Sequence, residues 1–374
     1  MLGTPTREPL QIGFIGGGLN SAVGYTHFNA SRLDGYFRVV AGSFSRDREQ
    51  NAATARAYGV SADRTHDDWR QLLSAEKGRL DAIVILTPTP SHADMVIAAL
   101  EAGHAVICEK ALGVSKDECD AIGAAVERTQ GFLAVTFNYS GYPMVRELRS
   151  LIASGALGRL QQIHIEMPQE GFLRRAAKPQ PWRLEDHFVP TVSLDLGVHV
   201  HHLIDFISGG LPWQDANAEH ASFGPFPGII DNVYCRATYA DDVKVQAWWG
   251  KTALGYRNGL RIRAFGSKGS AEWYQMTPEV LVCADDTGRT TTIDRGTSDT
   301  EIATQLRYHR FKAGHPSGFI EAFANLYNDI AESLHAFRNG LAERHPMVHG
   351  WRHASEGMAF LEQLSRSAGL GSPG

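Results

Sequence analysis

The chain has 374 residues and a formal net charge of −5 at pH 7, and its hydrophobic (43%) and charged (21%) fractions are ordinary for a globular protein. At about 100–200 residues per domain, this length favours two domains. The mild acidity argues against nucleic acid and anionic membranes as partners. No apolar run approaches the ~20 residues that cross a bilayer.

The first nine residues lack the apolar core of a signal peptide, so we expect a cytoplasmic protein. Four cysteines are scattered without Cys-x-x-Cys spacing, which favours reduced thiols over a zinc ribbon or a disulfide framework. No internal repeat or low-complexity tract occurs before the short Gly/Ser/Pro tail that begins at Gly369.

The first predicted strand, Gln11–Gly16, leads directly into three glycines and then a helical pattern over residues 22–28. A strand, a glycine turn and a helix start form a phosphate cradle, because glycine permits close backbone approach and the helix N-terminus favours negative charge. The G-x-G-x-x-G fingerprint is imperfect, since Ser21 occupies the position of the third glycine. A flexible turn is the alternative for a triple glycine alone.

The second predicted strand, Phe37–Ser45, ends at Ser45 and Arg46, where an NAD-specific site usually carries an acid for the ribose 2′-hydroxyl. A hydroxyl and a guanidinium suit a 2′-phosphate, so the sequence favours NADP over NAD. Asp47 can still bind a ribose hydroxyl, and Arg46 as a solvated loop charge is the alternative.

Strands and helices continue to alternate up to about residue 140. The predicted elements are a strand at Asp81–Leu86, a helix at Asp94–Ala102, a strand at 104–110, a helix at Ser115–Thr129 and a strand at Phe132–Phe137. This alternation predicts a doubly wound parallel sheet, a Rossmann domain over residues 1–140. Open α/β sheets bind ligands at the carboxyl ends of their strands, so we expect Lys110 to face the reacting carbon of a substrate.

Residues 141–374 are predicted to form a second domain, for substrate binding and oligomerisation. We expect a helix at Pro143–Ser154, a strand at Leu160–Ile165, mostly strands from Asp231 to Ile293, and helices at Phe319–Phe337 and Trp351–Ser365. The last helix is expected to pack back and close the fold. Trp248 and Trp249 are interpreted as packing or interface residues.

The most informative predicted helix is Ser193–Ser208. At 100° per residue, Asp195, His199 and His202 fall within about 60° of one another, and His201 lies on another face. An aspartate at i−4 can orient a histidine and make it more basic. A solvated or structural pair is one alternative, and a metal site another. No partner ligand cluster appears elsewhere, so we expect no metal.

Two loops carry further candidates. In the loop Lys178–Arg183, the Trp182 ring can stack on a sugar and the Arg183 guanidinium can bind an anion. The alternative is a packed tryptophan beside a surface arginine. The basic stretch from Tyr308 to Pro316 can receive a phosphate or carboxylate, or be a solvated loop.

The motifs together resemble the Gfo/Idh/MocA family of sugar-type oxidoreductases over most of the chain. They are the glycine turn, Thr87-Pro88-x-x-x-His92, Glu109-Lys110, Asp195-Leu-Gly-Val-His199 and Gly318-Phe-Ile-Glu-Ala-Phe. The resemblance implies a Rossmann domain followed by an α/β domain with a large, mainly antiparallel sheet. It also implies a homo-oligomer, a dimer or tetramer, formed through the open face of that sheet. Ala111 departs from the family's proline, and Ser21 from its glycine.

The residue patterns and the resemblance together give the expected site residues. Cofactor contacts are expected from Gly16, Gly18, Leu19, Asn20, Ser45, Arg46, Thr87, Pro88, His92, Glu109, Lys110 and Asn138. Catalysis is expected from Lys110, Asp195 and His199. Substrate contacts are expected from the same three residues and from Trp182, Arg183 and His202.

These features predict NAD(P)-dependent hydride transfer between nicotinamide C4 and a carbinol or keto carbon of a free sugar, sugar phosphate or nucleotide sugar. His199 is the expected base because imidazole changes charge nearest neutral pH. Lys110 would stabilise alkoxide charge, and Glu109 would support it. Asp195 would orient His199 or bind a neighbouring hydroxyl. The alternatives are a non-catalytic dinucleotide-binding sensor, which has no need of this set, and a metal-dependent lyase or hydrolase.

Overall fold

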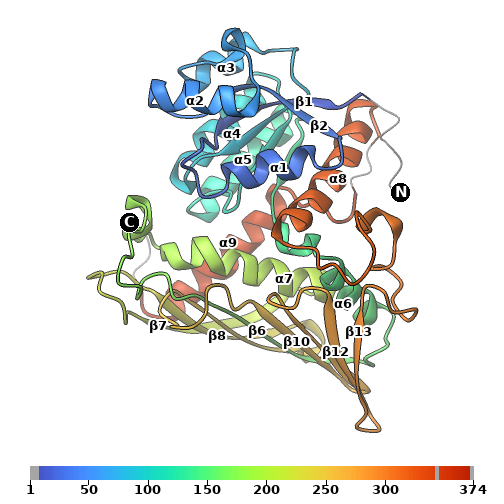
Figure 1. The fold of residues 1–374 in the computed structure, drawn as a ribbon. Coiled ribbons are helices and arrows are strands. Elements are labelled where there is room, and N and C mark those ends of the chain that lie inside the picture. Colours follow the sequence, from blue (N-terminus) through green and yellow to red (C-terminus); the bar gives the residue numbers. More distant parts are fainter. Residues whose placement is uncertain (1–7, 342–344, 371–374) are drawn as a thin grey trace. The chain divides into compact units, whose positions relative to one another are not determined.

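The computed structural model describes residues 8–341 and 345–370, which form two compact units. Within these ranges, unit 1 contains residues 8–141, 319–341 and 345–355, and unit 2 contains 142–318 and 356–370. Each unit has its own sheet (Figure 1). Among the described residues, no helix is both long enough and apolar enough to span a membrane.

Unit 1 is built on a five-stranded parallel sheet in the order β2-β1-β3-β4-β5. The strands are β1 (Leu10–Gly16), β2 (Phe37–Ser43), β3 (Ala82–Leu86), β4 (Val106–Cys108) and β5 (Leu133–Val135). The helices are α1 (Gly24–Arg32), α2 (Arg48–Tyr58), α3 (Trp69–Ala75), α4 (His92–Glu101), α5 (Lys116–Thr129) and α8 (Phe319–Arg338). The predicted Rossmann-type fold is confirmed.

The core of unit 1 explains why α8 belongs to it although it comes from the far end of the chain. β3 is buried along its whole length, as expected for a parallel strand covered on both faces. The fully buried Tyr327 of α8 sets its ring edge-on against Phe37 at a centroid distance of 5.4 Å. Phe28 of α1 stacks on Tyr58 of α2 at 4.0 Å. These aromatic contacts bind α1, α2 and α8 into one apolar layer.

Unit 2 contains an eight-stranded sheet in the order β13-β12-β11-β10-β6-β9-β8-β7, in which only β6 and β9 pair in parallel. The strands are β6 (Leu160–Pro168), β7 (Trp213–Ala221), β8 (Asn232–Tyr239), β9 (Lys244–Gly250), β10 (Arg261–Gly266), β11 (Gly269–Tyr274), β12 (Val280–Asp285) and β13 (Thr290–Asp294). Its helices are α6 (Pro143–Ala153), α7 (Val198–Ser208) and α9 (Trp351–Ser367), which begins in unit 1. The predicted large, mainly antiparallel sheet is confirmed.

The two faces of this sheet differ in chemistry. Helices α6 and α7 lie over one face (Figure 1), where Ile163 and Ile165 of β6 are buried. The intervening His164 and Glu166 point to the other face, which is polar and partly exposed. β7, which we did not predict, forms one edge of the sheet, and its mostly polar residues give little hydrophobic signal.

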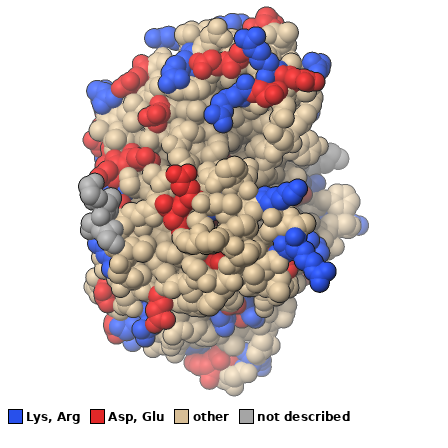
Figure 2. Space-filling view, turned by 90° about the vertical axis from the view of Figure 1, so that its left-hand side faces the viewer, with Lys and Arg blue, Asp and Glu red and all other residues tan. Residues whose placement is uncertain are grey.

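Surface charge is mixed on the side of the molecule drawn in Figure 2. Lys and Arg side chains are interspersed with Asp and Glu there, and neither sign forms a broad field. A mixed surface of this kind exerts little long-range steering on a polyanion approaching from that side.

Candidate functional site

The carboxyl ends of the unit 1 strands gather most of the residues predicted to bind a cofactor. Gly16 closes β1, and the loops after β2, β3, β4 and β5 carry the others. These are Ser45 and Arg46 after β2, Thr87 and Pro88 after β3, Glu109 and Lys110 after β4, and Asn138 after β5. The strand order reverses between β1 and β3, and ligands of open parallel sheets bind in the crevice at such a switch point.

The glycine turn after β1 has the close fit that a phosphate cradle requires. Gly16 and Gly17 adopt φ values of +77° and +73°, which favour glycine. A Cβ built on Gly24 would lie 2.1 Å from the carbonyl oxygen of Gly17, so α1 packs against the turn only because residue 24 is glycine. Ser21 instead accepts a hydrogen bond at Oγ from the Gly24 backbone N–H at 3.2 Å. Gly24, which sequence reasoning missed, therefore provides the close packing expected of the third glycine.

The segment between β1 and α1 has features that suit the pyrophosphate of a dinucleotide. α1 begins at Gly24, which packs against Gly17, so the N-terminus of a helix lies beside the close-packed glycines. Leu19 and Asn20 are exposed in the turn, and the backbone N–H of Leu19 donates to Oγ1 of Thr54 in α2 at 3.2 Å. The turn is thus held from α2, and its residues fit a pyrophosphate.

The loop after β2 places Arg46 in solvent. Asp47 caps α2, since its carboxylate accepts from the Gln50 backbone N–H at 2.8 Å. Ser45 Oγ accepts from the Asp47 backbone N–H at 3.1 Å. Ser45 is half-buried and Arg46 is exposed beside the start of α2. The roles of Ser45 and Arg46 toward a ribose stay predictions.

His92 connects two of the loops that carry predicted site residues. The side chain is fully buried, with Nδ1 2.7 Å from the carbonyl oxygen of Ala111 and Nε2 2.7 Å from that of Thr87. Burial lowers the pKa of His92 below its usual value, although the two carbonyl groups and Glu109 oppose this shift. The peptide between Lys110 and Ala111 is cis. His92 therefore ties the Thr87 loop to the residue after Lys110, and its predicted cofactor contact stays a prediction.

Glu109 lies in a buried polar cluster. Its Oε1 accepts from Thr136 Oγ1 and lies 3.0 Å from His27 Nε2, while His27 Nδ1 lies 2.8 Å from Tyr327 Oη. Burial acts to raise the pKa of Glu109, but the hydrogen bond and charge of His27, the charge of Lys110 and the Thr136 hydroxyl hold it below the usual value. The carboxylate is thus kept negative beside Lys110, which is half-buried.

In unit 2, the predicted helix begins differently from the expectation. Ser193–Gly197 is a π-helical turn, and α7 starts only at Val198. Trp249 of β9 donates from Nε1 to Ser193 Oγ at 3.1 Å. A Cβ on Gly197 would lie 3.1 Å from the Trp249 ring, so this turn is closely seated on the sheet. Single π-helical turns occur often at functional sites, and this one carries Asp195.

Asp195 is held by two cations. Lys251, which follows β9 and was missed by sequence reasoning, places Nζ 2.5 Å from Asp195 Oδ2. Arg183 donates from Nε and Nη2 to the two carboxylate oxygens at 3.2 Å each. The Arg183 guanidinium also stacks on the Trp182 ring at 4.5 Å. The structure thus brings Arg183, Trp182 and Asp195 together, as a packed group rather than as separate surface residues.

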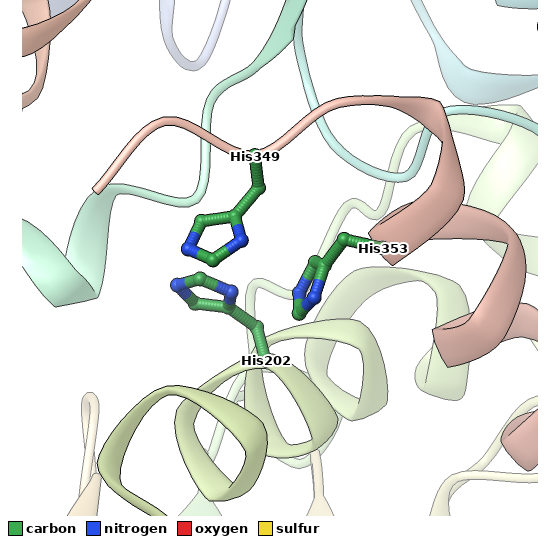
Figure 3. A group of neighbouring side chains, drawn as sticks. All are labelled: His202, His349 and His353. Atoms are coloured by element: carbon green, nitrogen blue, oxygen red, sulfur yellow. The ribbon is translucent and has the colours of Figure 1, made fainter. Parts of the chain in front are cut away.

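The α7 histidines are all buried, with His199 4% and His202 0% exposed. The expectation that Asp195, His199 and His202 bind no metal stays a prediction. His201 lies on another face, as predicted from the helical period, and its ring is 5.2 Å from that of Phe360. Figure 3 shows His202, which comes from α7. It also shows His349 and His353 of unit 1, whose imidazole rings pack together with their centroids 4.4 Å apart.

The basic loop before α8 is anchored from within unit 2. Arg146 donates to Tyr308 Oη at 2.8 Å, and Arg295 donates to the carbonyl oxygens of Tyr308 and His315 at 3.0 and 3.2 Å. Glu147 accepts three backbone N–H groups from residues 301–303. The loop backbone is therefore fixed, and both alternatives for its charges, anion binding and solvation, stay predictions.

Comparison with known proteins gives consistent matches. A Gfo/Idh/MocA oxidoreductase model with an NAD-binding Rossmann fold matches residues 10–137, and a Gfo/Idh/MocA C-terminal domain model matches 145–272. The chain is 29% identical over 380 residues to an uncharacterized oxidoreductase, YfiI, of Bacillus subtilis, covering 98% of this chain and 96% of that protein. It is 26% identical to inositol 2-dehydrogenase of Rhizobium meliloti, over 75% of this chain and 80% of that protein.

Solved structures agree with these matches. An inositol dehydrogenase homolog from Azotobacter vinelandii, crystallised with NADH and myo-inositol, superposes with a TM-score of 0.90 at 28% identity. The superposition covers 96% of each chain. The likeness therefore extends over both units and not only over the nucleotide-binding fold.

Proposed function

Because the chain belongs to the Gfo/Idh/MocA family of NAD-binding dehydrogenases and oxidoreductases, we propose that its substrate is a sugar or sugar derivative. The reaction would interconvert a carbinol and a keto carbon of a free sugar, sugar phosphate or nucleotide sugar. A bound nicotinamide would accept or supply the hydride. Related proteins named inositol 2-dehydrogenase and glucose-6-phosphate 3-dehydrogenase support this class of substrate.

Each proposed residue has a distinct role. His199 takes the hydroxyl proton when the carbinol is oxidised and returns it when the keto group is reduced. Lys110 donates a hydrogen bond to the same oxygen and stabilises its developing negative charge. Asp195 binds a neighbouring hydroxyl or orients His199. The glycine turn of residues 16–18, with Leu19 and Asn20, would hold the pyrophosphate.

The observation that carries this proposal is the placement of Lys110. It follows β4 at the carboxyl edge of the parallel sheet, beside an ionised, buried Glu109, in the same edge as the glycine turn. A sensor that merely binds a dinucleotide would need the glycine turn but not a charged pair maintained at this edge. The placement therefore favours an enzyme over the sensor alternative.

A direct test is a spectrophotometric screen for NAD(P)H formation with myo-inositol, levoglucosan, glucose 6-phosphate and UDP-glucose. We expect at least one of these probes, or its keto form in the reverse direction, to change the NAD(P)H absorbance. Tight dinucleotide binding without turnover of any probe would favour the sensor. Activity abolished by a chelator would favour the metal-dependent alternative.

For the cofactor, we propose a preference for NADP that rests on Ser45 and Arg46. Arg46 is exposed at the start of α2, where its guanidinium is available for a 2′-phosphate. Replacing Arg46 by alanine is expected to weaken NADP binding by about tenfold or more, since charge-assisted hydrogen bonds contribute about 1.5–3 kcal/mol, and to leave NAD binding nearly unchanged. Fluorescence titration with both dinucleotides measures this.

The matched control for this prediction is Arg48→Ala. Arg48 stands two residues later, is 84% exposed, and pairs with Asp67 at 3.1 Å. It should leave both affinities unchanged, because a surface pair of this kind has little energetic value. Equal loss of NAD and NADP affinity in Arg46→Ala, or no loss of either, would show that Arg46 does not read the 2′-phosphate.

We also propose that the protein forms a homo-oligomer, a dimer or tetramer, through the polar face of the unit 2 sheet. Tyr234 and Trp248 are paired across β8 and β9 and stack with parallel rings on this face. Both side chains line a hollow in this face, together with acids and bases that include Glu166, Arg236 and Arg263. Aromatic anchors with charges of both signs suit a self-complementary interface.

Sedimentation velocity tests this interface. Trp248→Lys is expected to shift the wild-type oligomer toward a smaller species, because a charge would replace the central aromatic contact. Leu306→Lys is the control, since Leu306 is 79% exposed and lies outside the sheet. A monomeric wild type, or an unchanged mass in Trp248→Lys, would remove the proposal.

A further inference from the structure

We propose that Lys251 is a positioning residue that acts through Asp195 by fixing the carboxylate in place. This inference rests on the proposed function, because it requires Asp195 to take part in the reaction. Lys251 directly follows β9, whereas Asp195 lies in the π-helical turn before α7. All residues that carry the inference belong to unit 2.

The pair is close and buried. Nζ of Lys251 lies 2.5 Å from Oδ2 of Asp195, and their side chains are only 9% and 10% exposed. The Phe172 ring lies 5.6 Å from the same ammonium group, which adds an apolar wall with a favourable cation–π contact. Lysine loses much side-chain entropy on burial, and removing one partner of a buried ion pair is costly. The two residues are therefore expected to hold each other in one arrangement.

A second cation approaches the carboxylate from a more exposed position. Arg183 contacts both oxygens of Asp195 at 3.2 Å, and its side chain is 22% exposed. Nη1 of Arg183 is itself anchored by Oε1 of Gln180 at 2.7 Å. The Asp195 carboxylate is thus paired with Lys251 on its buried side and with Arg183 on its more exposed side.

This arrangement determines what Asp195 does chemically. Opposite charges nearby favour the ionised form of a carboxyl group. A carboxylate flanked by two cations accepts hydrogen bonds well but is a poor proton acceptor. Asp195 would therefore bind a hydroxyl or fix an imidazole, and proton transfer would be left to His199. Lys251 would hold the Asp195 carboxylate in place for this role without contacting the reacting atoms.

The test is a double-mutant cycle with myo-inositol and each dinucleotide as the probes. Lys251→Met is expected to lower kcat by about 10–100-fold with a smaller change in KM, since a small misplacement of a site group has effects of this size. Lys251→Arg should recover part of the loss. In an Asp195→Asn background, Lys251→Met should add little further loss, because its route of action is already removed.

Lys244→Met is the matched control. Lys244 begins the same strand, is 55% exposed, and pairs with Asp242 at 2.5 Å. It should show wild-type kcat, and thermal unfolding of every variant separates loss of fold from loss of activity. Each single variant leaves the other member of the buried Lys251–Asp195 pair without its partner, and it can fold poorly for that reason. The double variant Asp195→Asn/Lys251→Met removes both members of the pair and avoids this problem.

The outcomes separate this inference from the proposed function. If Asp195→Asn turns over like the wild type, both ideas fail for Asp195. If Asp195→Asn is impaired while Lys251→Met is normal, or if the two losses are additive, only the Lys251 inference fails. A crystal structure of Lys251→Met needs no substrate: a displaced Asp195 carboxylate supports the inference, and an unmoved one overturns it.

Discussion

Replacing Lys110 by methionine is expected to lower kcat by about 10²–10³-fold, the usual cost of removing one preorganised donor to a developing oxyanion. Methionine keeps the length of the side chain but removes the ammonium. The dinucleotide should bind with far smaller loss, because the glycine turn and the loops after β2 and β3 are untouched. Steady-state kinetics and fluorescence titration of the dinucleotide measure the two effects separately.

Lys116→Met is the matched control for this experiment. Lys116 is the first residue of α5, is 42% exposed, and pairs with Asp120 one turn later. Its loss should change kcat less than twofold, since such i,i+4 pairs contribute only about 0.3–0.5 kcal/mol. A Lys110→Met enzyme with wild-type kcat would show that the charge at the end of β4 has no part in the chemistry.

The fold of unit 1 could be predicted because its signals are local. Buried parallel strands give continuous apolar runs, as in Ala82–Leu86, and the glycines after β1 mark the turn. The strand at 104–110 was predicted too long. The strand itself is Val106–Cys108, although the Glu109 backbone N–H still donates to the carbonyl oxygen of Ile85 in β3 at 2.9 Å. Beyond that bond the chain turns into the loop that carries Lys110, and the Glu109 side chain lies beside His27 and Thr136.

The rest of the site depends on contacts between residues that are distant in sequence. Lys251 reaches Asp195 across 56 positions, and His27 reaches Tyr327 across 300. Neither residue stands in a motif of its own, so sequence spacing gives no signal for either. The π-helical turn is similar, because it depends on how Gly197 and Ser193 meet Trp249 of a different strand. A uniform 100° per residue cannot anticipate such a change of helical geometry.

His199 is the second residue for which we expect a large effect. Replacing it by glutamine should lower kcat by about 10²–10⁴-fold in either direction of reaction, the range found for a lost general acid–base. Glutamine retains polarity and approximate size in a side chain that is only 4% exposed, so the loss should reflect chemistry more than packing. Lys110 and the two cations on Asp195 would remain, and they would account for the residual rate.

His201→Gln separates the role of His199 from burial of an imidazole in the same helix. His201 is as deeply buried, but it faces α9, where its Nδ1 would lie 2.9 Å from a Cβ on Gly357. We expect this variant to lose thermal stability and to keep its kcat. Equal loss of kcat in both variants would mean that α7 contributes packing alone. Loss of kcat in His199→Gln, with unfolding no earlier than in His201→Gln, would place proton transfer on His199.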